Sequence, residues 1–176
     1  MKADGRRGLM LNQSLFFLFP LITVLAGIGD LLTMKIPNRI TMALLAAFCI
    51  AAPFAIGWNP SVLAGHLGAG LIMLVVGFAF FAFGWIGGGD AKFAAVAALW
   101  LGLPQLLAFV VFASVFGGIL TIALMLFRYV PLPQAAERVV WIDRLHTLAE
   151  GIPYGLALAA SALAVYPKSI WINLLY

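Results

Sequence analysis

The chain has 176 residues, of which 65% are hydrophobic and 9% are charged, and its formal net charge is +4. Soluble domains carry about 25% charged residues, so a soluble globular fold is excluded because it could not solvate its surface. The lipid bilayer is therefore the expected solvent. In such a protein the positive charge bears on topology, and we expect no nucleic-acid partner.

Apolar residues gather in six segments along the chain, at residues 14–33, 40–57, 62–86, 92–103, 105–127 and 152–167. A membrane-spanning helix needs about 20 residues, and the first, second, third and fifth segments meet that length easily. The fourth segment is shorter and ends at Pro104, which marks either a tight turn or a kink. The sixth is also short, and its glycine and alanine content suits close helix packing. We therefore predict an all-α polytopic membrane protein with about six transmembrane helices, in one domain over residues 1–176.

Residues 1–13 form an N-terminal segment ahead of the first span. Basic residues followed by an apolar run resemble a signal peptide. The run is longer than the usual apolar core of about 7–15 residues, however, and no clear A-x-A cleavage site follows it. We expect the run to be retained as a membrane span.

A polar stretch at residues 128–151 separates the fifth and sixth apolar segments. Its apolar positions Val139, Val140, Ile142 and Leu145 alternate with charges at roughly helical spacing. The spacing favours an amphipathic helix that lies on the membrane surface.

The distribution of lysine and arginine between loops predicts the orientation of the chain. Alternating spans place one group of basic residues on one side: Lys35, Arg39, Lys92, Arg128, Arg138 and Arg144. The other side receives Lys2, Arg6, Arg7 and Lys168. The larger group is expected on the cytoplasmic side, which leaves the N-terminus outside.

Two carboxylates lie close to the predicted spans, where acids are costly and usually functional. Asp30 is near the end of the first span, and Asp90 opens the fourth. Because the chain crosses the membrane twice between them, both are expected on the same side. For Asp30 alone, an ion pair with a cation such as Lys35 is the structural alternative.

The glycines Gly87, Gly88 and Gly89 precede Asp90 in "GWIGGGDAKF", residues 84–93. Glycines adopt conformations that other residues resist, and they let another backbone, such as an extended peptide, approach closely. Asp90 alone would serve as a helix cap. For Lys92 the sequence leaves a functional role, in which it biases the charge of the carboxylates or binds substrate, and a structural one, in which it extends to the lipid headgroups.

Paired carboxylates suggest a specific chemistry. Two carboxyl groups a few ångströms apart share a proton because both cannot ionise easily. The ionised group takes a proton from water and the protonated group donates one to a peptide carbonyl, which hydrolyses the peptide without a covalent intermediate.

Three sequence elements resemble the type IV prepilin peptidases. "GGGDAK" is similar to their G-x-G-D-x-K signature, at Gly87, Gly89, Asp90 and Lys92. "DLLTMKIPN" resembles their first aspartate element, at Asp30, Ile36, Pro37 and Asn38, and "IPYGLALA", residues 152–159, resembles the start of their final helix. The elements follow the family order, and the resemblance covers about residues 15–167.

The resemblance implies a membrane-embedded aspartic endopeptidase in which Asp30 and Asp90 are catalytic and face the cytoplasm. Its substrates would be prepilins or pilin-like proteins, which carry a short basic leader before a long apolar helix and are cut at the junction. The implied location is the bacterial inner membrane. The implied supporting residues are Gly87, Gly88, Gly89, Lys92, Pro37 and Asn38, and no metal or cofactor is implied.

Larger family members carry an extra N-terminal region with paired cysteines and also methylate the new pilin terminus. The chain has one cysteine and only 13 residues before the first span. It therefore resembles the short, peptidase-only form of tight-adherence (Flp-type) pilus systems, and no methyltransferase activity is expected.

Three alternatives remain from the sequence. Archaeal preflagellin peptidases share both aspartate elements. A small ion-coupled transporter also uses intramembrane acids and glycine-broken helices, although no paired halves are visible. A non-catalytic assembly protein is a third alternative, against which the presence of both aspartates counts. The particular pilin and the oligomeric state are not predicted.

Several isolated residues have ordinary structural interpretations. Cys49 is expected in the core, since free cysteines are usually buried. His66 is expected to form a hydrogen bond inside the bundle. Asn38 suits an N-cap of the second span, after a turn fixed by Pro37. After the last span, Trp171 and Tyr176 suit the headgroup region.

Overall fold

The computed structural model describes residues 2–57, 59–148 and 151–175, and helices make up nearly all of its regular structure. The long helices are α1 (Lys2–Thr33), α2 (Asn38–Ala55), α3 (Pro60–Ala82), α4 (Gly88–Leu101) and α5 (Leu103–Tyr129). Two short helices, α6 (Gln134–Glu137) and α7 (Val140–His146), precede α8 (Tyr154–Val165). The 3₁₀ helices η2 (Tyr166–Lys168) and η3 (Ile170–Leu175) end the chain.

The predicted apolar segments all become helices. Four of them are long and apolar enough to cross a membrane: Gln13–Thr33, Asn38–Ala55, Pro60–Ala82 and Leu103–Tyr129. The helices α4, with 14 residues, and α8, with 12 residues, are shorter than the roughly 20 residues that a crossing needs. The all-α prediction is confirmed, whereas the count of six spans stays a prediction.

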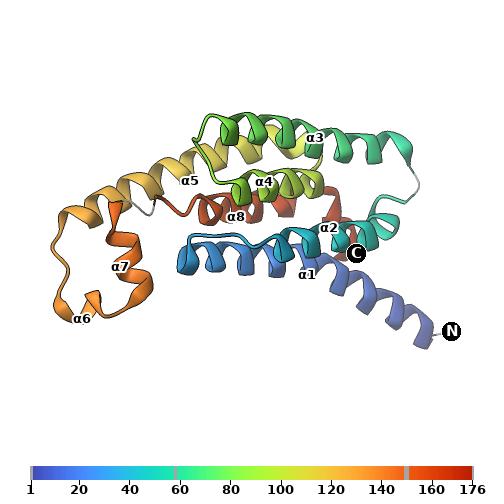
Figure 1. Ribbon diagram of the computed structural model, residues 1–176. Coiled ribbons are helices and arrows are strands. Elements are labelled where there is room, and N and C mark those ends of the chain that lie inside the picture. Colours follow the sequence, from blue (N-terminus) through green and yellow to red (C-terminus); the bar gives the residue numbers. More distant parts are fainter. Residues whose placement is uncertain (1, 58, 149–150, 176) are drawn as a thin grey trace.

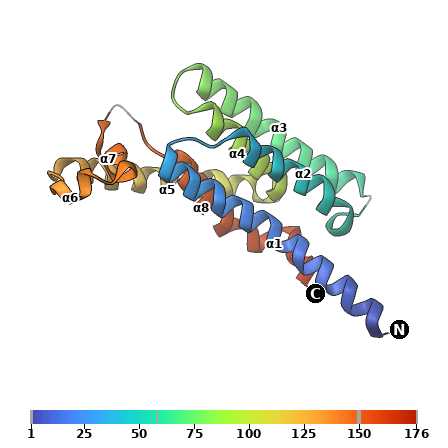
Figure 2. The ribbon, with the colours of Figure 1, turned by 60° about the horizontal axis from the view of Figure 1, so that its bottom comes forward.

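The helices form an elongated bundle with α4 in its interior (Figures 1 and 2). α4 packs mainly against α3 and also contacts α8, α5 and α2. α8 lies against α1 and α5. The C-terminal end of α1, the loop before α4 and the start of α8 lie at the same end of the bundle, and α5 extends beyond that end (Figure 1).

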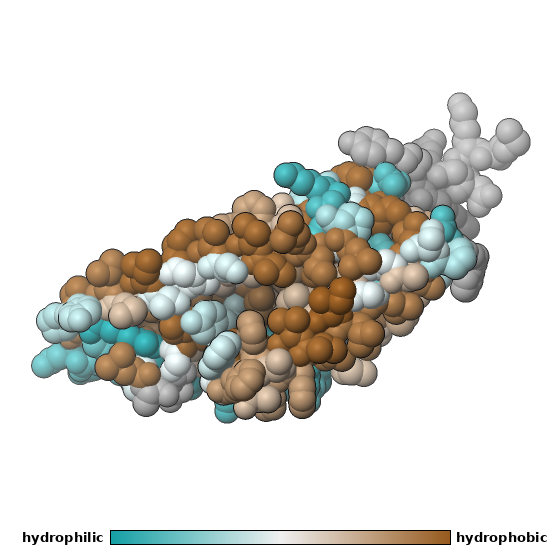
Figure 3. Space-filling model, turned by 90° about the horizontal axis from the view of Figure 1, so that it is seen from above, coloured by the Kyte–Doolittle hydropathy of each residue, from teal (hydrophilic) through white to brown (hydrophobic). Residues whose placement is uncertain are grey.

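The outer surface of the bundle is strongly apolar (Figure 3). The helices α3 and α5 expose large side chains such as Leu71 (62%), Phe78 (66%) and Leu107 (76%). Exposure of these side chains to water would be unfavourable, whereas lipid chains solvate them well. The surface therefore agrees with a membrane protein.

Close packing around α4 depends on small residues. Most of its positions from Ala91 to Leu101 are buried, and five of those are alanines. At Gly70 and Gly77 of α3, an added Cβ would lie 3.1 Å from the Cβ atoms of Leu99 and Ala91 respectively. Small residues let helices approach each other closely. Such close packing drives helix association in a bilayer, because lipid is as apolar as the helices and the hydrophobic effect does not bring them together.

The junction between α4 and α5 is a turn of one residue, Gly102, whose φ of 74° favours glycine. Pro104 lies in the first turn of α5, where its missing N–H costs nothing. Of the two expectations for Pro104, the tight turn is therefore the one observed.

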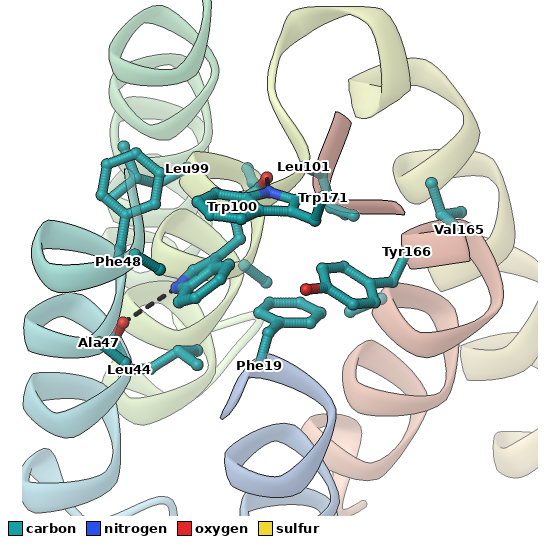
Figure 4. Close-up of a cluster of buried hydrophobic side chains, with 14 of the residues drawn as sticks. Phe19, Leu44, Ala47, Phe48, Leu99, Trp100, Leu101, Val165, Tyr166 and Trp171 are labelled. Carbon is teal, nitrogen blue, oxygen red and sulfur yellow. Dashed lines mark hydrogen bonds between the residues drawn. The ribbon is translucent and has the colours of Figure 1, made fainter. Parts of the chain in front are cut away.

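Aromatic rings fill the core at the end of the bundle away from the aspartates (Figure 4). Trp100, Trp171 and Phe19 are fully buried, and the rings of Trp100 and Trp171 are 4.4 Å apart. The indole of Trp100 donates to the carbonyl of Leu44 at 2.9 Å, and that of Trp171 donates to the carbonyl of Trp100. The expectation that Trp171 lies among headgroups is wrong, because η3 folds back onto the bundle. Tyr176 lies outside the described residues.

Of the predictions for other isolated residues, the one for His66 is confirmed and the one for Cys49 is wrong. His66 is buried, and its Nδ1 is 2.7 Å from the carbonyl oxygen of Leu99, as expected for a bundle-facing histidine. Cys49 is exposed on α2, so its predicted place in the core is wrong. Hydropathy does not separate a lipid-facing position from a buried one.

The polar stretch at 128–151 contains two short helices, α6 and α7. Val140, Ile142 and Leu145, three of the positions expected to form an amphipathic helix, lie in α7, whereas its place on the membrane surface stays a prediction. α6 starts directly after Pro133, and Arg138 and Val139 interrupt the helix before α7. Arg128 at the end of α5 links α5 to α7, because its Nε donates to the carbonyl of Leu145 at 2.8 Å.

Candidate active site

Asp30 lies in the last turn of α1 and is 3% exposed. Its Oδ2 has no hydrogen-bond partner from Lys35 or any other described residue, so this atom does not form the ion pair considered as an alternative. The carboxylate faces the backbone amides of Gly155 and Leu156, at the start of α8. A helix N-terminus carries free N–H groups and partial positive charge, so α8 favours a negative charge at Asp30.

Asp90 occupies a corresponding place at a second helix. It is the third residue of α4, and its carboxylate faces the backbone amide of Gly87, the residue that caps α4. An acid at this position satisfies a free N–H and lies near the positive end of the helix. This position agrees with the capping role expected for Asp90 alone.

Both carboxylates line one cavity of about 440 Å³. They are near enough to interact electrostatically. The cavity is formed by the segment that joins α1 to α2 and by the glycine-rich segment before α4; its lining residues are Asp30, Met34, Lys35, Ile36, Pro37, Asn38, Gly87, Gly88, Gly89 and Asp90. The common face predicted from the two intervening crossings is therefore a shared cavity.

Two of the three glycines before Asp90 serve close packing against other segments, and none of the three has an unusual backbone. None of them has a positive φ. An added Cβ at Gly89 would lie 3.1 Å from the carbonyl oxygen of Ile36, and one at Gly88 would lie 3.3 Å from the ring of Phe81. The chain itself therefore fills the Cβ positions of these two glycines, while the approach of an extended peptide to the glycine-rich segment stays a prediction.

Asn38 and Lys92 meet beside the cavity. Pro37 is the capping residue of α2 and Asn38 is its first helical residue, so the predicted N-cap role of Asn38 is wrong. The Oδ1 of Asn38 instead accepts a hydrogen bond of 3.1 Å from the Nζ of Lys92. Lys92 does not line the cavity of the carboxylates; with Asn38 it lines a neighbouring cleft of about 490 Å³ between α2, α3 and α4.

Gly155 supports the site in a way that the sequence did not indicate. An added Cβ would lie 2.8 Å from Oδ2 of Asp30 and 2.5 Å from Cδ1 of Ile36, distances too short for a real side chain. Glycine is therefore needed for α8 to approach Asp30 this closely. The one available signal was its place in "IPYGLALA", residues 152–159.

Met34 and Arg144 are two further residues that sequence reasoning missed. Met34 follows α1 with a φ of 55°, a conformation that costs a non-glycine residue about 1–2 kcal/mol. Strain of this kind gathers at functional sites. Arg144 of α7 donates from Nη1 to the carbonyl of Leu32 at 3.2 Å, which satisfies a free carbonyl at the end of α1.

The chain matches the type IV leader peptidase family over residues 17–122. It belongs to this family. Both Asp30 and Asp90 lie within the matched residues, whereas α8 follows them. Comparison with curated proteins and with solved structures gave no match. The resemblance seen in the sequence is thereby confirmed, and the protein is a peptidase.

The peptidase has a polar cavity inside an apolar helical bundle. In the described part of the chain, no three His, Cys, Asp or Glu side chains come together as a metal site. The carboxyl groups of Asp30 and Asp90 line this cavity together with two other polar side chains, those of Lys35 and Asn38.

Proposed function

We propose that this peptidase is an aspartic endopeptidase that removes the short basic leader from prepilins or pilin-like proteins. The observation that carries the proposal is the shared cavity of Asp30 and Asp90. Family membership supports the leader-peptidase activity. The proposed location is the bacterial inner membrane, in several spans, with the cavity toward the cytoplasm.

The proposed mechanism uses one proton shared by the two carboxyl groups. The ionised carboxylate removes a proton from a water molecule, whose oxygen attacks the carbonyl carbon of the scissile peptide. The protonated carboxyl group donates its proton to the carbonyl oxygen. When the tetrahedral gem-diol intermediate collapses, the C–N bond breaks and the carboxyl group that took the proton from water gives it to the leaving nitrogen. The other carboxylate takes the proton of a gem-diol hydroxyl group, so the dyad again holds one proton.

The two helix N-termini give this dyad a fixed electrostatic setting. The start of α8 faces Asp30 and the start of α4 faces Asp90, so partial positive charge lies behind both carboxylates. Dipoles that are already oriented need no reorganisation when charge moves during the reaction. The burial of Asp30 limits its contact with bulk water.

The basic residues support the proposed orientation. Lys35 lines the cavity, Lys92 bonds to Asn38 beside it, and Arg144 bonds to the end of α1. The segment before residue 13, with its three basic residues, starts at the opposite end of α1 (Figure 1). The larger basic group and the carboxylates therefore belong to the same face, which the rule for positive loops assigns to the cytoplasm.

Co-expression with a prepilin tests the proposal. We expect the wild-type chain to remove the leader and both Asp30→Asn and Asp90→Asn to leave it intact, because each substitution removes a proton-exchanging group without changing the shape of the side chain. Loss of the leader is seen as a mass decrease, and the product is expected to carry no added methyl group. Processing by both variants would show that the dyad assignment is wrong.

The same experiment separates the alternatives. A preflagellin offered in place of the prepilin tests the archaeal type of substrate. An ion-coupled transporter would leave both substrates uncut and carry ion flux in proteoliposomes, and that flux would depend on Asp30 or Asp90.

A further inference from the structure

Asp90 stands between two cavities of different character. On one side lies the cavity of about 440 Å³ that it shares with Asp30. On the other side lies a cleft of about 330 Å³ between α3 and α5, with α4 and α8 at its base. This space, here called the α3–α5 cleft, is lined almost entirely by apolar side chains apart from Asp90, Ser114 and Tyr154.

The α3–α5 cleft opens toward the surrounding lipid. Val76 and Phe80 of α3 form one wall and Val110 of α5 forms the other, and these side chains are 38–41% exposed. Figure 3 shows the face that carries α3 and α5, where hydrophobic residues predominate. An apolar segment in the bilayer could therefore reach the cleft sideways, without passing through water.

A shallow depression continues the cleft along α5. It is lined by Ser114, Gly117, Gly118 and Thr121, and Tyr154 borders both spaces. The hydroxyl groups of Ser114 and Thr121 donate to carbonyls of their own helix, at 2.9 Å and 2.8 Å. Because these two hydroxyl groups already have hydrogen-bond partners, an apolar helix can cover them without leaving an unpaired donor.

We propose that the α3–α5 cleft holds the apolar helix of the substrate. This inference rests on the proposed function, in which the substrate carries a basic leader before an apolar helix. A helix seated in the cleft brings its end to Asp90, which is also a wall of the polar cavity where water meets both carboxylates. The scissile junction between apolar and polar segments then coincides with the boundary between an apolar and a polar cavity.

The cleft between α2, α3 and α4 is the competing position. It is larger, at about 490 Å³, and it is also apolar apart from Asn38, Thr41 and Lys92. Neither aspartate lines it. A helix bound there would have its end beside Lys92 and Asn38. Asn38 also lines the cavity of the carboxylates, but only the α3–α5 cleft has one of the two aspartates in its lining, so the α3–α5 cleft is favoured.

Site-specific photo-cross-linking distinguishes the two clefts. The probe is a prepilin-type chain with a short lysine-containing leader, a glycine and an apolar helix of about 20 residues. A photoreactive amino acid replaces Ser114 or, for the competing cleft, the 62%-exposed Leu71, in an Asp30→Asn chain that leaves the probe intact. We expect a cross-link from position 114 and none from position 71.

A second variant blocks the cleft without disturbing the fold. Gly118 is exposed and an added Cβ meets nothing within 4 Å, so Gly118→Leu should fold and project into the depression. Leader removal is expected to fall by about tenfold or more, since small displacements of a substrate cost large factors in rate. Gly65→Leu is the matched control, because Gly65 of α3 is also helical with open space, and it should process at the wild-type rate.

The outcomes separate this inference from the proposed function. If wild type processes the probe but position 114 gives no cross-link, or Gly118→Leu processes at the wild-type rate, the cleft assignment is overturned and the peptidase assignment stands. If wild type leaves the probe uncut, the proposed function itself fails.

Discussion

The two ends of the bundle satisfy their polar groups in different ways. At the end away from the aspartates, the indoles of Trp100 and Trp171 and the ring of His66 all reach backbone carbonyls within the core. At the other end, Oδ2 of Asp30 is buried without a hydrogen-bond partner among the described residues, and the carboxylate is one wall of a cavity. The same helices thus form one end whose polar groups are hydrogen-bonded and another end where a buried carboxylate oxygen is not.

The difference shows how a small membrane protein can hold a polar cavity, here the proposed active site, within an apolar bundle. α4 runs from Asp90 at one end to Trp100 at the other, and its position is fixed by aromatic packing around Trp100. Rigid packing at one end positions the carboxylate at the opposite end. Unsatisfied polar groups are costly in an apolar setting, and their retention points to function.

The largest expected effect is the loss of the aromatic anchor. Trp100→Ala removes a fully buried ring together with its hydrogen bond to Leu44, and it should lower the free energy of unfolding by about 3–5 kcal/mol. Thermal unfolding in detergent measures the loss. Trp85→Ala is the control, because Trp85 is 66% exposed and its ring packs against those of Phe80 and Phe83. Equal losses in both variants would contradict the distinction between the ends.

Gly155→Ala should act on the reactive end alone. The methyl group would press on Oδ2 of Asp30 and on Ile36, and we expect leader removal to slow on the order of 100-fold through displacement of the carboxylate. Gly29→Ala, in the same turn as Asp30 but with open space, is the matched control and should retain the wild-type rate. The measurement is the rate of leader removal per folded molecule. An unchanged rate for Gly155→Ala would mean that α8 does not position Asp30.

Met34→Gly tests whether the reactive end stores strain. Relief of the left-handed conformation should raise the free energy of unfolding by about 1 kcal/mol or less, after the entropy cost of glycine. Met34→Ala keeps the strained backbone and should show no such gain. Thermal unfolding of the two variants gives the comparison, and equal stabilities would argue against strain at this residue.

The smallest expected effect lies at the exposed pair of Lys92 and Asn38. A double-mutant cycle with Lys92→Met and Asn38→Ala should give a coupling of about 0.5 kcal/mol, since exposed hydrogen bonds contribute little to stability. The KM for a prepilin should also change little, because Lys92 lies outside the cavity of the carboxylates. A large rise in KM would restore Lys92 to the substrate-binding role considered from the sequence.

Much of the local structure followed from the sequence. Each apolar segment became a helix, and the polar segments became turns or short helices. The positions of Asp30 and Asp90 at one end followed from the even number of crossings between them, and the GGGDAK and IPN elements indicated the family.

Side-chain environments were harder to predict. Cys49 was expected in the core and is exposed, whereas Trp171 was expected at the headgroups and is fully buried. The fit of Gly155 against Asp30 depends on two residues 125 positions apart, which no local pattern records. Asn38 was expected to cap its own helix and instead bonds to Lys92, 54 residues away.

The sequence by itself determined which segments are apolar enough for a bilayer, which acids accompany them, and that Asp30 and Asp90 lie at the same end of the bundle. Only the tertiary structure decided which helix faces meet, where the cavities lie, and that the starts of α4 and α8 face the two carboxylates. The physical reason is that lipid and protein interior are about equally apolar, so hydropathy selects the helix but not its partners. Which helices pack together in this protein depends on small residues and on a few hydrogen bonds. Both kinds of contact form only when the helices are side by side.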